Sequence, residues 1–251
     1  MQFHNLVSYL DDYLRIATIA DYGPQGLQVE AADGDVQMIA VSTDSALPVI
    51  DDAVQAGAQL LIVHHGLFWG NPERLCGALG RRVRRLFEAN LSLYAAHLAL
   101  DAHPEVGNNA VLARELGLQI TDWWAEVNEI KIGVLANAPA GWTRNDLVET
   151  VRTVLPGEPL VQLYGPSQVR RVAILSGDGA DFLAQAQAIG ADTVITGETS
   201  HAAYYRAQEL ALNVVYAGHY ATETLGVRAL AQHLAERFGL ATIWIDHPTG
   251  L

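Results

Sequence analysis

Short apolar runs alternate along the chain with longer stretches that have helical spacing. The clearest run covers residues 60–63, four aliphatic side chains in succession, and is typical of a strand covered on both faces. Similar runs predict strands at 37–42, 91–95, 130–136, 160–164, 172–175, 193–196, 214–216 and 242–245. Apolar positions three and four residues apart, with capping signals, predict helices at 3–20, 46–56, 80–90, 108–116, 144–154, 178–188, 200–210 and 224–238.

Repeated alternation of strand and helix predicts an α/β fold, with mostly parallel sheets and helices on both sides. Two rounds of it predict two α/β lobes, residues 1–125 and 126–251, interleaved at the termini. We expect the boundary near residues 121–130, and a loop at 21–29, where Gly and Pro are frequent. Thr143 is the expected cap of the helix at 144–154, and Asp44 or Ser45 that of the helix at 46–56.

Composition limits the function. With 50% hydrophobic residues among 251, the chain can bury a real core. The formal net charge of −13 disfavours tight binding of duplex nucleic acid. Cys76 is the only cysteine, so an intrachain disulfide is excluded and a cytoplasmic location is expected. We see neither a signal peptide nor an apolar run of the ~18 residues that a membrane span needs.

Candidate chemistry follows three of the predicted strands. His64 and His65 end the strand at 60–63, and if both serve one site the backbone must turn there, which Gly66 would ease. For a bare His-His pair, one core and one surface histidine would be the simpler interpretation. Asp101 follows the strand at 91–95 without an obvious helix to cap. The interpretation of these residues as metal ligands is favoured because a third strand end carries the same residue types.

His219 and Glu223 follow the strand at 214–216, four residues apart, so their side chains can meet on one side. Favourable charge at a helix N-terminus would explain Glu223 alone. Imidazole and carboxylate together suit Zn, Mn, Fe, Co or Ni better than Ca or Mg. Five ligands exceed what one catalytic zinc takes, whereas two ions about 3.5–4 Å apart use five naturally. We therefore predict two divalent ions, with Asp101 or Glu223 as the bridge.

The ordered set of motifs resembles the GTP cyclohydrolase I type 2 family, also called Nif-three-like proteins. The resemblance runs from about residue 20 to the C-terminus and rests on several short segments. These are Gly26-Leu27-Gln28-Val29, His64 to Gly70, His97 to Asp101, Ser176 to Ala180, Thr196-Gly197-Glu198 with His201, Gly218 to Glu223, and Ile245 to Pro248. One departure is Gly66, where many relatives have proline.

The resemblance implies a two-lobed α/β fold with a dinuclear metal site in the cleft between the lobes. Its ligands match the five residues reached above: His64, His65, Asp101, His219 and Glu223. Similar proteins form a ring-shaped homohexamer, a trimer of dimers, with the metal sites facing an inner cavity. The size resembles the short bacterial form, without the inserted domain of some relatives.

The histidine at position 97 also belongs to the family pattern, and we expect it to orient Asp101 or meet substrate. Glu198 and His201 either line the same cavity or belong to a surface helix cap. These three are the candidate catalytic residues. Four further histidines are interpreted as structural or surface residues: His4, His103, His233 and His247. The aromatic residues Phe68, Trp69, Trp123 and Trp124 are interpreted as packing or interface rather than a base-stacking platform.

The function expected is a metal-dependent hydrolase of a nucleotide or another small molecule, with metal-activated water as nucleophile. The family name implies attack on C8 of a purine and release of formate. Two alternatives remain. One is a non-catalytic, metal-stabilised scaffold or regulatory protein, and the other is a dinuclear phosphatase, nuclease or peptidase.

Overall fold

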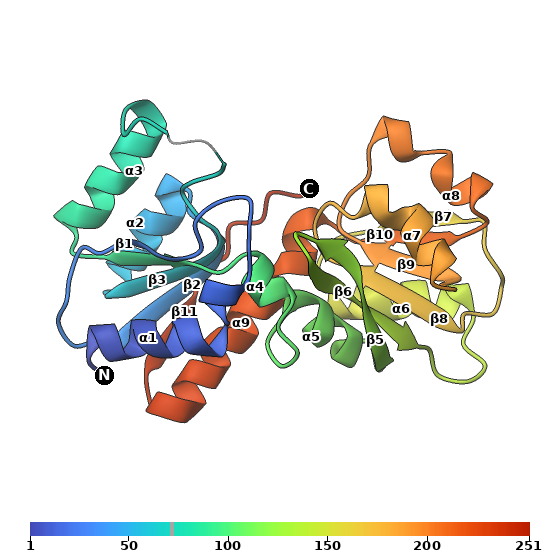
Figure 1. Cartoon of the computed structure of the whole chain (residues 1–251), viewed down its shortest axis with the longest axis horizontal. Coiled ribbons are helices and arrows are strands. Elements are labelled where there is room, and N and C mark those ends of the chain that lie inside the picture. The colour runs from blue at the N-terminus through green and yellow to red at the C-terminus, as the bar shows by residue number, and fades with distance from the viewer. Residues whose placement is uncertain (71–72) are drawn as a thin grey trace. The chain divides into compact units, whose positions relative to one another are not determined.

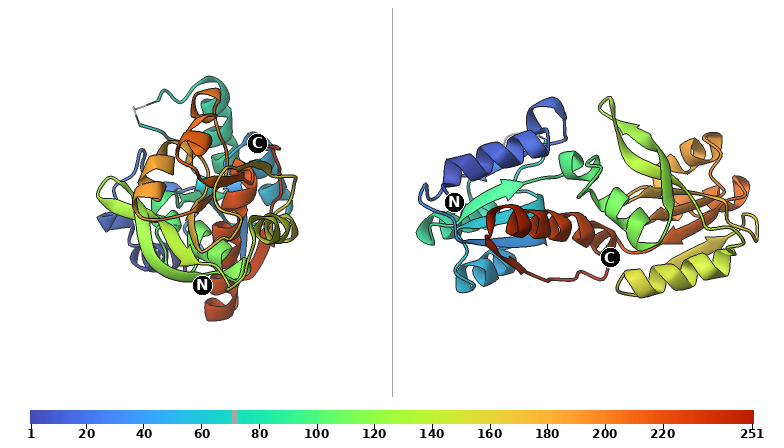
Figure 2. Two further views of the ribbon diagram at one scale, coloured as in Figure 1. Left: turned by 90° about the vertical axis from the view of Figure 1, so that its right-hand side faces the viewer. Right: turned by 90° about the horizontal axis from the view of Figure 1, so that it is seen from below.

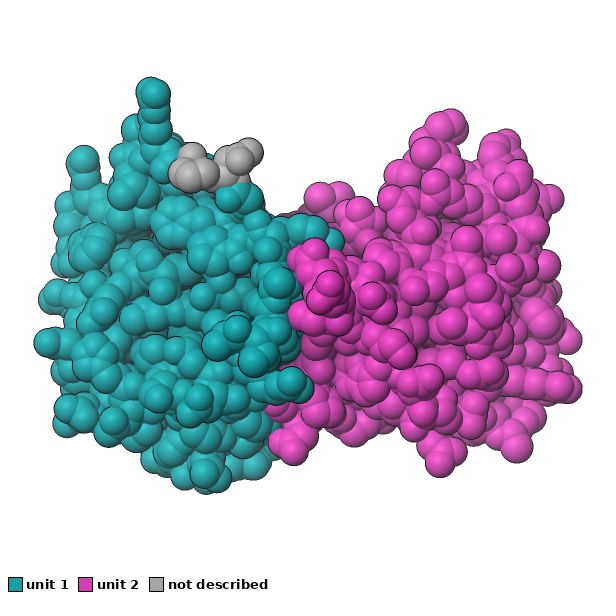
Figure 3. All heavy atoms as spheres, viewed as in Figure 1, with its two compact units in different colours: residues 1–100, 227–247 teal, residues 101–226, 248–251 magenta. Residues whose placement is uncertain are grey.

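The computed structural model describes residues 1–70 and 73–251 of the chain. The chain forms two compact units, coloured separately in Figure 3. Unit 1 comprises Met1–Leu100 and Val227–His247, and unit 2 comprises Asp101–Gly226 and Pro248–Leu251. Nowhere in the described ranges is a helix long and apolar enough to cross a membrane.

Unit 1 is built on a five-stranded sheet of order β1-β4-β3-β2-β11. Its strands are β1 (Gly26–Val29), β2 (Met38–Asp44), β3 (Leu60–His65), β4 (Ser92–Ala95) and β11 (Ala241–Trp244). Only β1 runs antiparallel to its neighbour β4, and the other pairs are parallel. The carboxyl ends of β2, β3 and β4 therefore lie at one edge of the sheet, where their polar side chains can converge.

Helices cover both faces of this sheet (Figure 1). On one side lie α2 (Leu47–Gln55) and α3 (Gly77–Glu88), and on the other α1 (Phe3–Tyr13) and α9 (His219–Phe238). Strand β3 serves both faces: Leu61 and Val63 belong to the core shared with α2 and α3, and the alternate residues Leu60 and Ile62 are equally buried. Full burial of one such side chain stabilises the fold by about 1.5–3 kcal/mol. This explains the continuous apolar run.

Unit 2 contains a six-stranded sheet of order β5-β6-β8-β9-β10-β7. The strands are β5 (Gln119–Val127), β6 (Ile130–Asn137), β7 (Leu160–Leu163), β8 (Arg171–Leu175), β9 (Thr193–Thr196) and β10 (Asn213–Tyr216). Strands β8, β9 and β10 are mutually parallel, whereas β5, β6 and β7 pair antiparallel. This sheet is mixed, so the expectation of mostly parallel pairing fits unit 1 and not unit 2.

Helices α5 (Asn108–Glu115) and α6 (Arg144–Val154) pack on one face of the second sheet and share an apolar cluster with it. The remaining short helices of the chain are η1 (Ile16–Thr18), α4 (Leu98–Asp101), η2 (Ala180–Phe182), α7 (Leu183–Ala188), η3 (His201–Ala203) and α8 (Arg206–Glu209). The prediction of an α/β fold with two lobes is confirmed. Thr143 caps α6 in a complete capping box with Asp146, also as predicted.

Several local expectations differ from the structure. The segment around residues 121–130, expected to be a boundary, is strand β5, and the units divide at Leu100–Asp101 instead. The reason is that β5 pairs along its length with β6, which ties Trp123 and Trp124 to the second sheet. The loop expected at 21–29 contains β1, which β4 holds as an edge strand. Helix α2 begins after Ala46 without a side-chain cap.

Candidate functional site

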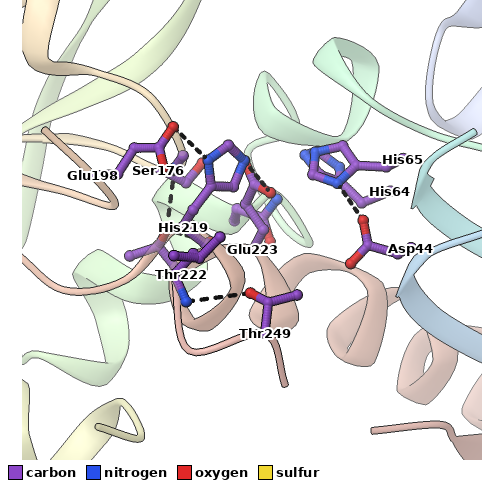
Figure 4. Close-up of polar contacts among 12 residues, drawn as sticks. Asp44, His64, His65, Ser176, Glu198, His219, Thr222, Glu223 and Thr249 are labelled. Carbon is purple, nitrogen blue, oxygen red and sulfur yellow. Dashed lines mark hydrogen bonds and ion pairs between the residues drawn. The ribbon is translucent and has the colours of Figure 1, made fainter. Parts of the chain in front are cut away.

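The histidine pair lies at the end of β3. The strand continues through His65, so the turn expected at the pair occurs just after it, at Gly66. The strand can continue because β2 still pairs there, Asp44 opposite His65, although β4 pairs only as far as Val63. The two imidazole rings nevertheless lie 4.8 Å apart between centroids. Figure 4 shows both side chains extending from this strand end.

Both imidazoles are oriented through Nδ1. The Nδ1 of His64, a fully buried residue, lies 2.9 Å from the carbonyl oxygen of Ala96. The Nδ1 of His65 lies 2.9 Å from Oδ1 of Asp44. A histidine that donates Nδ1–H to a carbonyl or carboxylate carries its lone pair on Nε2, which is the usual arrangement of metal-binding histidines. Asp44, expected as a helix cap, is thus a partner of His65.

A third imidazole joins the pair. His97 lies just beyond β4, with its ring centroid 4.9 Å from that of His64 and 5.6 Å from that of His65. Its Nδ1 lies 2.9 and 3.1 Å from the two carboxylate oxygens of Asp21. The three histidines offer ligand nitrogens within 4.8 Å of one another. This set of donors fits a transition-metal cation.

Asp21 is built into the fold as an anion. Its side chain is 2% exposed, and its Oδ2 also accepts the backbone N–H of Leu98 at 2.9 Å. Burial by itself raises the pKa of Asp21, but the hydrogen bond and charge of His97, with the amides of Leu98 and Tyr22, lower it below its usual 3.8. His97 is therefore held by a charged carboxylate.

Gly66 has a packing reason of its own. A Cβ at this position would lie 2.3 Å from Nε2 of Gln28. The Gln28 amide is fixed at both ends, because Nε2 donates to Pro24 O at 2.6 Å and Oε1 accepts the amide of Leu67 at 2.7 Å. Glycine after the histidine pair therefore admits a side chain that braces the turn.

In unit 2, Asp101 ends the short helix α4 and is buried. Its Oδ1 accepts hydrogen bonds from Nδ2 of Asn108 at 2.9 Å and from Oγ of Ser176 at 3.2 Å. Asn108 is fully buried and its Oδ1 accepts the amide of Gly226 at 2.7 Å. The carboxylate is thus held in one orientation by two neighbouring elements.

His219 and Glu223 lie on α9, which begins at His219 rather than at residue 224 as expected. They are one helical turn apart, with Nε2 of His219 3.1 Å from Oε2 of Glu223. On its other side, Nδ1 of His219 lies 3.2 Å from Oε1 of Glu198, which follows β9 (Figure 4). The imidazole therefore lies between two carboxylates.

Glycine is required at two places around this pair. Gly177 has φ +66°, and a Cβ there would lie 2.3 Å from Oε1 of Glu223. A Cβ on Gly197 would lie 2.6 Å from the carbonyl oxygen of Gly177 and 2.7 Å from Cα of His219. The two glycine loops thus approach α9 as closely as backbone permits.

The electrostatics of this cluster favour a cation. The hydrogen bond to Glu223 raises the pKa of His219 to about 9 against the effect of burial, with the charges of Glu223 and Glu198 adding to the rise. Burial, followed by the charges of Glu198 and Asp181, raises the pKa of Asp178. The negative charges of Glu223 and Glu198 stabilise the protonated, positively charged form of His219, and the same charges would stabilise a divalent ion.

The structure places His201 on the surface of unit 2. It opens η3 and is exposed. Among residues 1–70 and 73–251, no hydrogen bond or ion pair joins its side chain to the other candidates. Glu198, the companion candidate, contacts His219 directly.

Comparison with known proteins agrees with these motifs. The family model for Duf34/NIF3 (NGG1p interacting factor 3) matches residues 1–249. A Deinococcus radiodurans protein called "GTP cyclohydrolase 1 type 2 homolog" is 42% identical over 246 residues, covering 98% of this chain and 93% of its own. The chain belongs to the Duf34/NIF3 family. The resemblance stated from the sequence is thereby confirmed.

Other members of the Duf34/NIF3 family cover the chain completely. A Pyrococcus abyssi protein of the same name is 40% identical over 252 residues, all of both chains. Protein ybgI, described as of unknown function, matches the whole structure with TM-score 0.93 and 36% identity, covering 100% of both chains. TTHA1606 from Thermus thermophilus matches with TM-score 0.91 and 42% identity, again over 100% of both. The fold is therefore that of the family.

Sequence reasoning missed the residues that orient the candidate ligands. Asp21 lay in a segment interpreted as loop, and Asn108 in the first turn of a helix. Asp44 could have been found, because it ends the strand parallel to β3 and stands opposite His65 in the register. A carboxylate and an imidazole at adjacent carboxyl ends are expected to meet.

Proposed function

We propose that the chain is a dinuclear metal-dependent hydrolase of a small molecule. The proposed ligands are His64, His65, Asp101, His219 and Glu223. The observation that carries the proposal is the way the chain itself orients these side chains: Nδ1 of each paired histidine is already held by an acceptor, and Asp101 is held by two donors. Such orientation is what a metal site requires.

Divalent ions bound there would supply Lewis acidity and lower the pKa of water towards neutrality. The chain itself supplies proton transfer and positioning. His97 presents Nε2 to the reacting groups because Asp21 occupies Nδ1, and it takes a proton from the nucleophile and returns it to the leaving group. Glu198 holds the ring of His219 in place through Nδ1.

For the substrate we propose a nucleotide or purine-like molecule. This rests on the name shared by the homologues, in which "homolog" marks likeness to a GTP cyclohydrolase. The reaction would open the imidazole ring of the purine by hydrolysis at C8 and release formate.

The decisive experiment measures bound metal and hydrolysis on the same preparations. After loading with Mn²⁺ or Zn²⁺ and desalting, the wild type is expected to retain two ions per chain and to release formate from GTP. The variants His64→Ala and His219→Ala, each removing one ligand, are expected to retain one ion or none and to lose hydrolysis. His4→Ala is the matched control, because His4 is exposed and its ion pair is with the surface residue Glu30.

Retention of two ions by both variants would sink the proposed site. If the wild type binds two ions and the variants lose them, but the wild type hydrolyses no nucleotide, the result would favour the non-catalytic scaffold. His97→Gln separates the roles: we expect it to keep both ions and to lower kcat by about 10²–10⁴. Loss of an ion in this variant would make His97 a ligand instead.

We also propose, from the family resemblance, that the chain assembles into a homohexamer in the cytoplasm. Light scattering coupled to size exclusion would then give six times the 27.1 kDa of the single chain. A monomeric or dimeric mass at micromolar concentration would contradict this assembly.

A further inference from the structure

Unit 2 contains a cavity that involves none of the candidate metal ligands. It has a volume of about 160 Å³ and lies by the β5–β6 hairpin, drawn in light green in Figure 2. Strand β8 and helix α7 complete its lining. A cavity of about 150 Å³ accommodates a benzene-sized group, so this one accepts the apolar part of a small metabolite.

One wall of the cavity is apolar and rigid. Trp124 is buried, and its indole N–H is shared between the carbonyl oxygens of Val134 at 3.0 Å and Ile174 at 3.2 Å. Gly133 makes room for it, since a Cβ there would lie 2.8 Å from Nε1 of Trp124. Next along the strand, Ala125 lines the cavity with φ +56°, a conformation that costs a non-glycine residue about 1–2 kcal/mol. Strain of this kind in a strand points to a constraint other than packing.

The charged residues around the cavity are of both signs. Arg171 and Lys131 line it together with Asp122 and Glu126. Lys131 and Glu126 stand directly opposite each other on β6 and β5. Within the part of the chain that the structure describes, neither of them nor Arg171 is engaged in an ion pair. Two cations and two carboxylates thus surround an apolar pocket, and one of the carboxylates, Asp122, already accepts the amide of Trp123.

We propose that this cavity binds a zwitterion, an α-amino acid with an apolar side chain of leucine or phenylalanine size. The carboxylate would pair with the guanidinium of Arg171, which is half-buried and so less screened than a surface charge. The ammonium would pair with Glu126, and the side chain would pack against Trp123 and Trp124. A simple carboxylate lacks the ammonium that Glu126 would bind, and a simple amine lacks the carboxylate that Arg171 would bind, so both charges of the zwitterion would contribute to binding.

The test is titration calorimetry of the full chain with L-leucine and L-phenylalanine, each compared with two analogues. For leucine these are 4-methylpentanoate, which lacks the ammonium, and 3-methylbutylamine, which lacks the carboxylate. We expect at least one amino acid to bind, and each of its analogues to bind about tenfold or more weakly. No binding of either amino acid at 10 mM (roughly the weakest affinity of interest) would overturn the proposal, as would equal affinity for the analogues.

Variants locate the binding site. Arg171→Gln is expected to weaken amino-acid binding about tenfold or more, and Arg170→Gln, its exposed neighbour outside the lining, to leave it unchanged. If Arg171→Gln does not fold, Glu126→Gln on the exposed rim tests the ammonium contact in the same way. Equal weakening by Arg170→Gln would assign the effect to net charge and contradict the site. Because metal content is measured separately, failure here leaves the proposed hydrolase untouched.

Discussion

Gly177→Ala offers a sharp test of the geometry around Glu223. The added Cβ would lie 2.3 Å from Oε1 of Glu223, whereas ordinary contact begins at 3.4 Å, so the carboxylate must move by about 1 Å. Metal–ligand distances tolerate only ~0.2 Å. The φ of +66° adds a strain of about 1–2 kcal/mol, which is small against a typical stability of ~5–15 kcal/mol. We therefore expect a folded protein with a displaced ligand.

The assay is calorimetric titration of Mn²⁺ or Zn²⁺ into metal-free protein, beside scanning calorimetry. Gly117→Ala is the matched control, because Gly117 has φ +70° and nothing within 4 Å of an added Cβ. Both variants should lose a few degrees of Tm, about 2–4 °C per kcal/mol. Only Gly177→Ala should lose metal affinity, by about tenfold or more. Equal affinity in the two variants, whether both intact or both weakened, would refute the reasoning.

Three further substitutions test the supports of the two clusters and of the fold. The pKa of Asp21 is lower in the folded chain than the usual 3.8, so its charge stabilises the fold above pH 3.8, and this contribution is lost as the pH falls through the pKa of the folded state. Asp21→Asn should therefore lower the free energy of unfolding by about 1–3 kcal/mol at pH 7. Urea unfolding measured between pH 3 and 7 should show that the stability of the variant falls less steeply with acidity than that of the wild type. Identical pH profiles would contradict the charged contact with His97. Asn108→Ala removes two buried hydrogen bonds, including that to Asp101, and should lower the free energy of unfolding by about 2–4 kcal/mol. A urea concentration at half-unfolding equal to that of the wild type would show that water replaces these two hydrogen bonds. Thr143→Ala removes the capping box and should cost ~1 kcal/mol, read as a drop in Tm that Thr143→Ser restores.

Much of the fold was predictable because buried strands and amphipathic helices leave periodic signals. Strand β3 reads as a continuous apolar run, since helices cover both of its faces. Strand β1 was missed, because an edge strand of four residues that follows Gly23 and Pro24 carries too short a pattern. Strand β5 was missed because its exposed and buried positions do not alternate, and a bulge between Ile120 and Asp122 shifts its register.

The candidate ligands were accessible from the sequence because each follows a strand end, where α/β sheets gather polar groups. Their partners were less accessible. Asp21 and His97 are separated by 76 positions in the sequence, and Ser176 and Asp101 by 75. At such separations the local sequence pattern does not indicate which side chains meet. His201 also follows a strand end, and the short helix that it opens leaves its imidazole exposed.

The last strand of the chain has a consequence for biosynthesis. Strand β11 completes the first sheet by pairing with β2, Ala241 opposite Met38, after all of residues 101–226 have been made. At ribosomal rates of ~5–20 residues per second, β2 waits about 10–40 s with one edge open. Unit 2, nearly contiguous in the chain, can fold while the nascent polypeptide is still attached, whereas unit 1 is complete only after β11 has been made. Premature termination before residue 241 would therefore expose an aggregation-prone strand edge on an otherwise formed sheet.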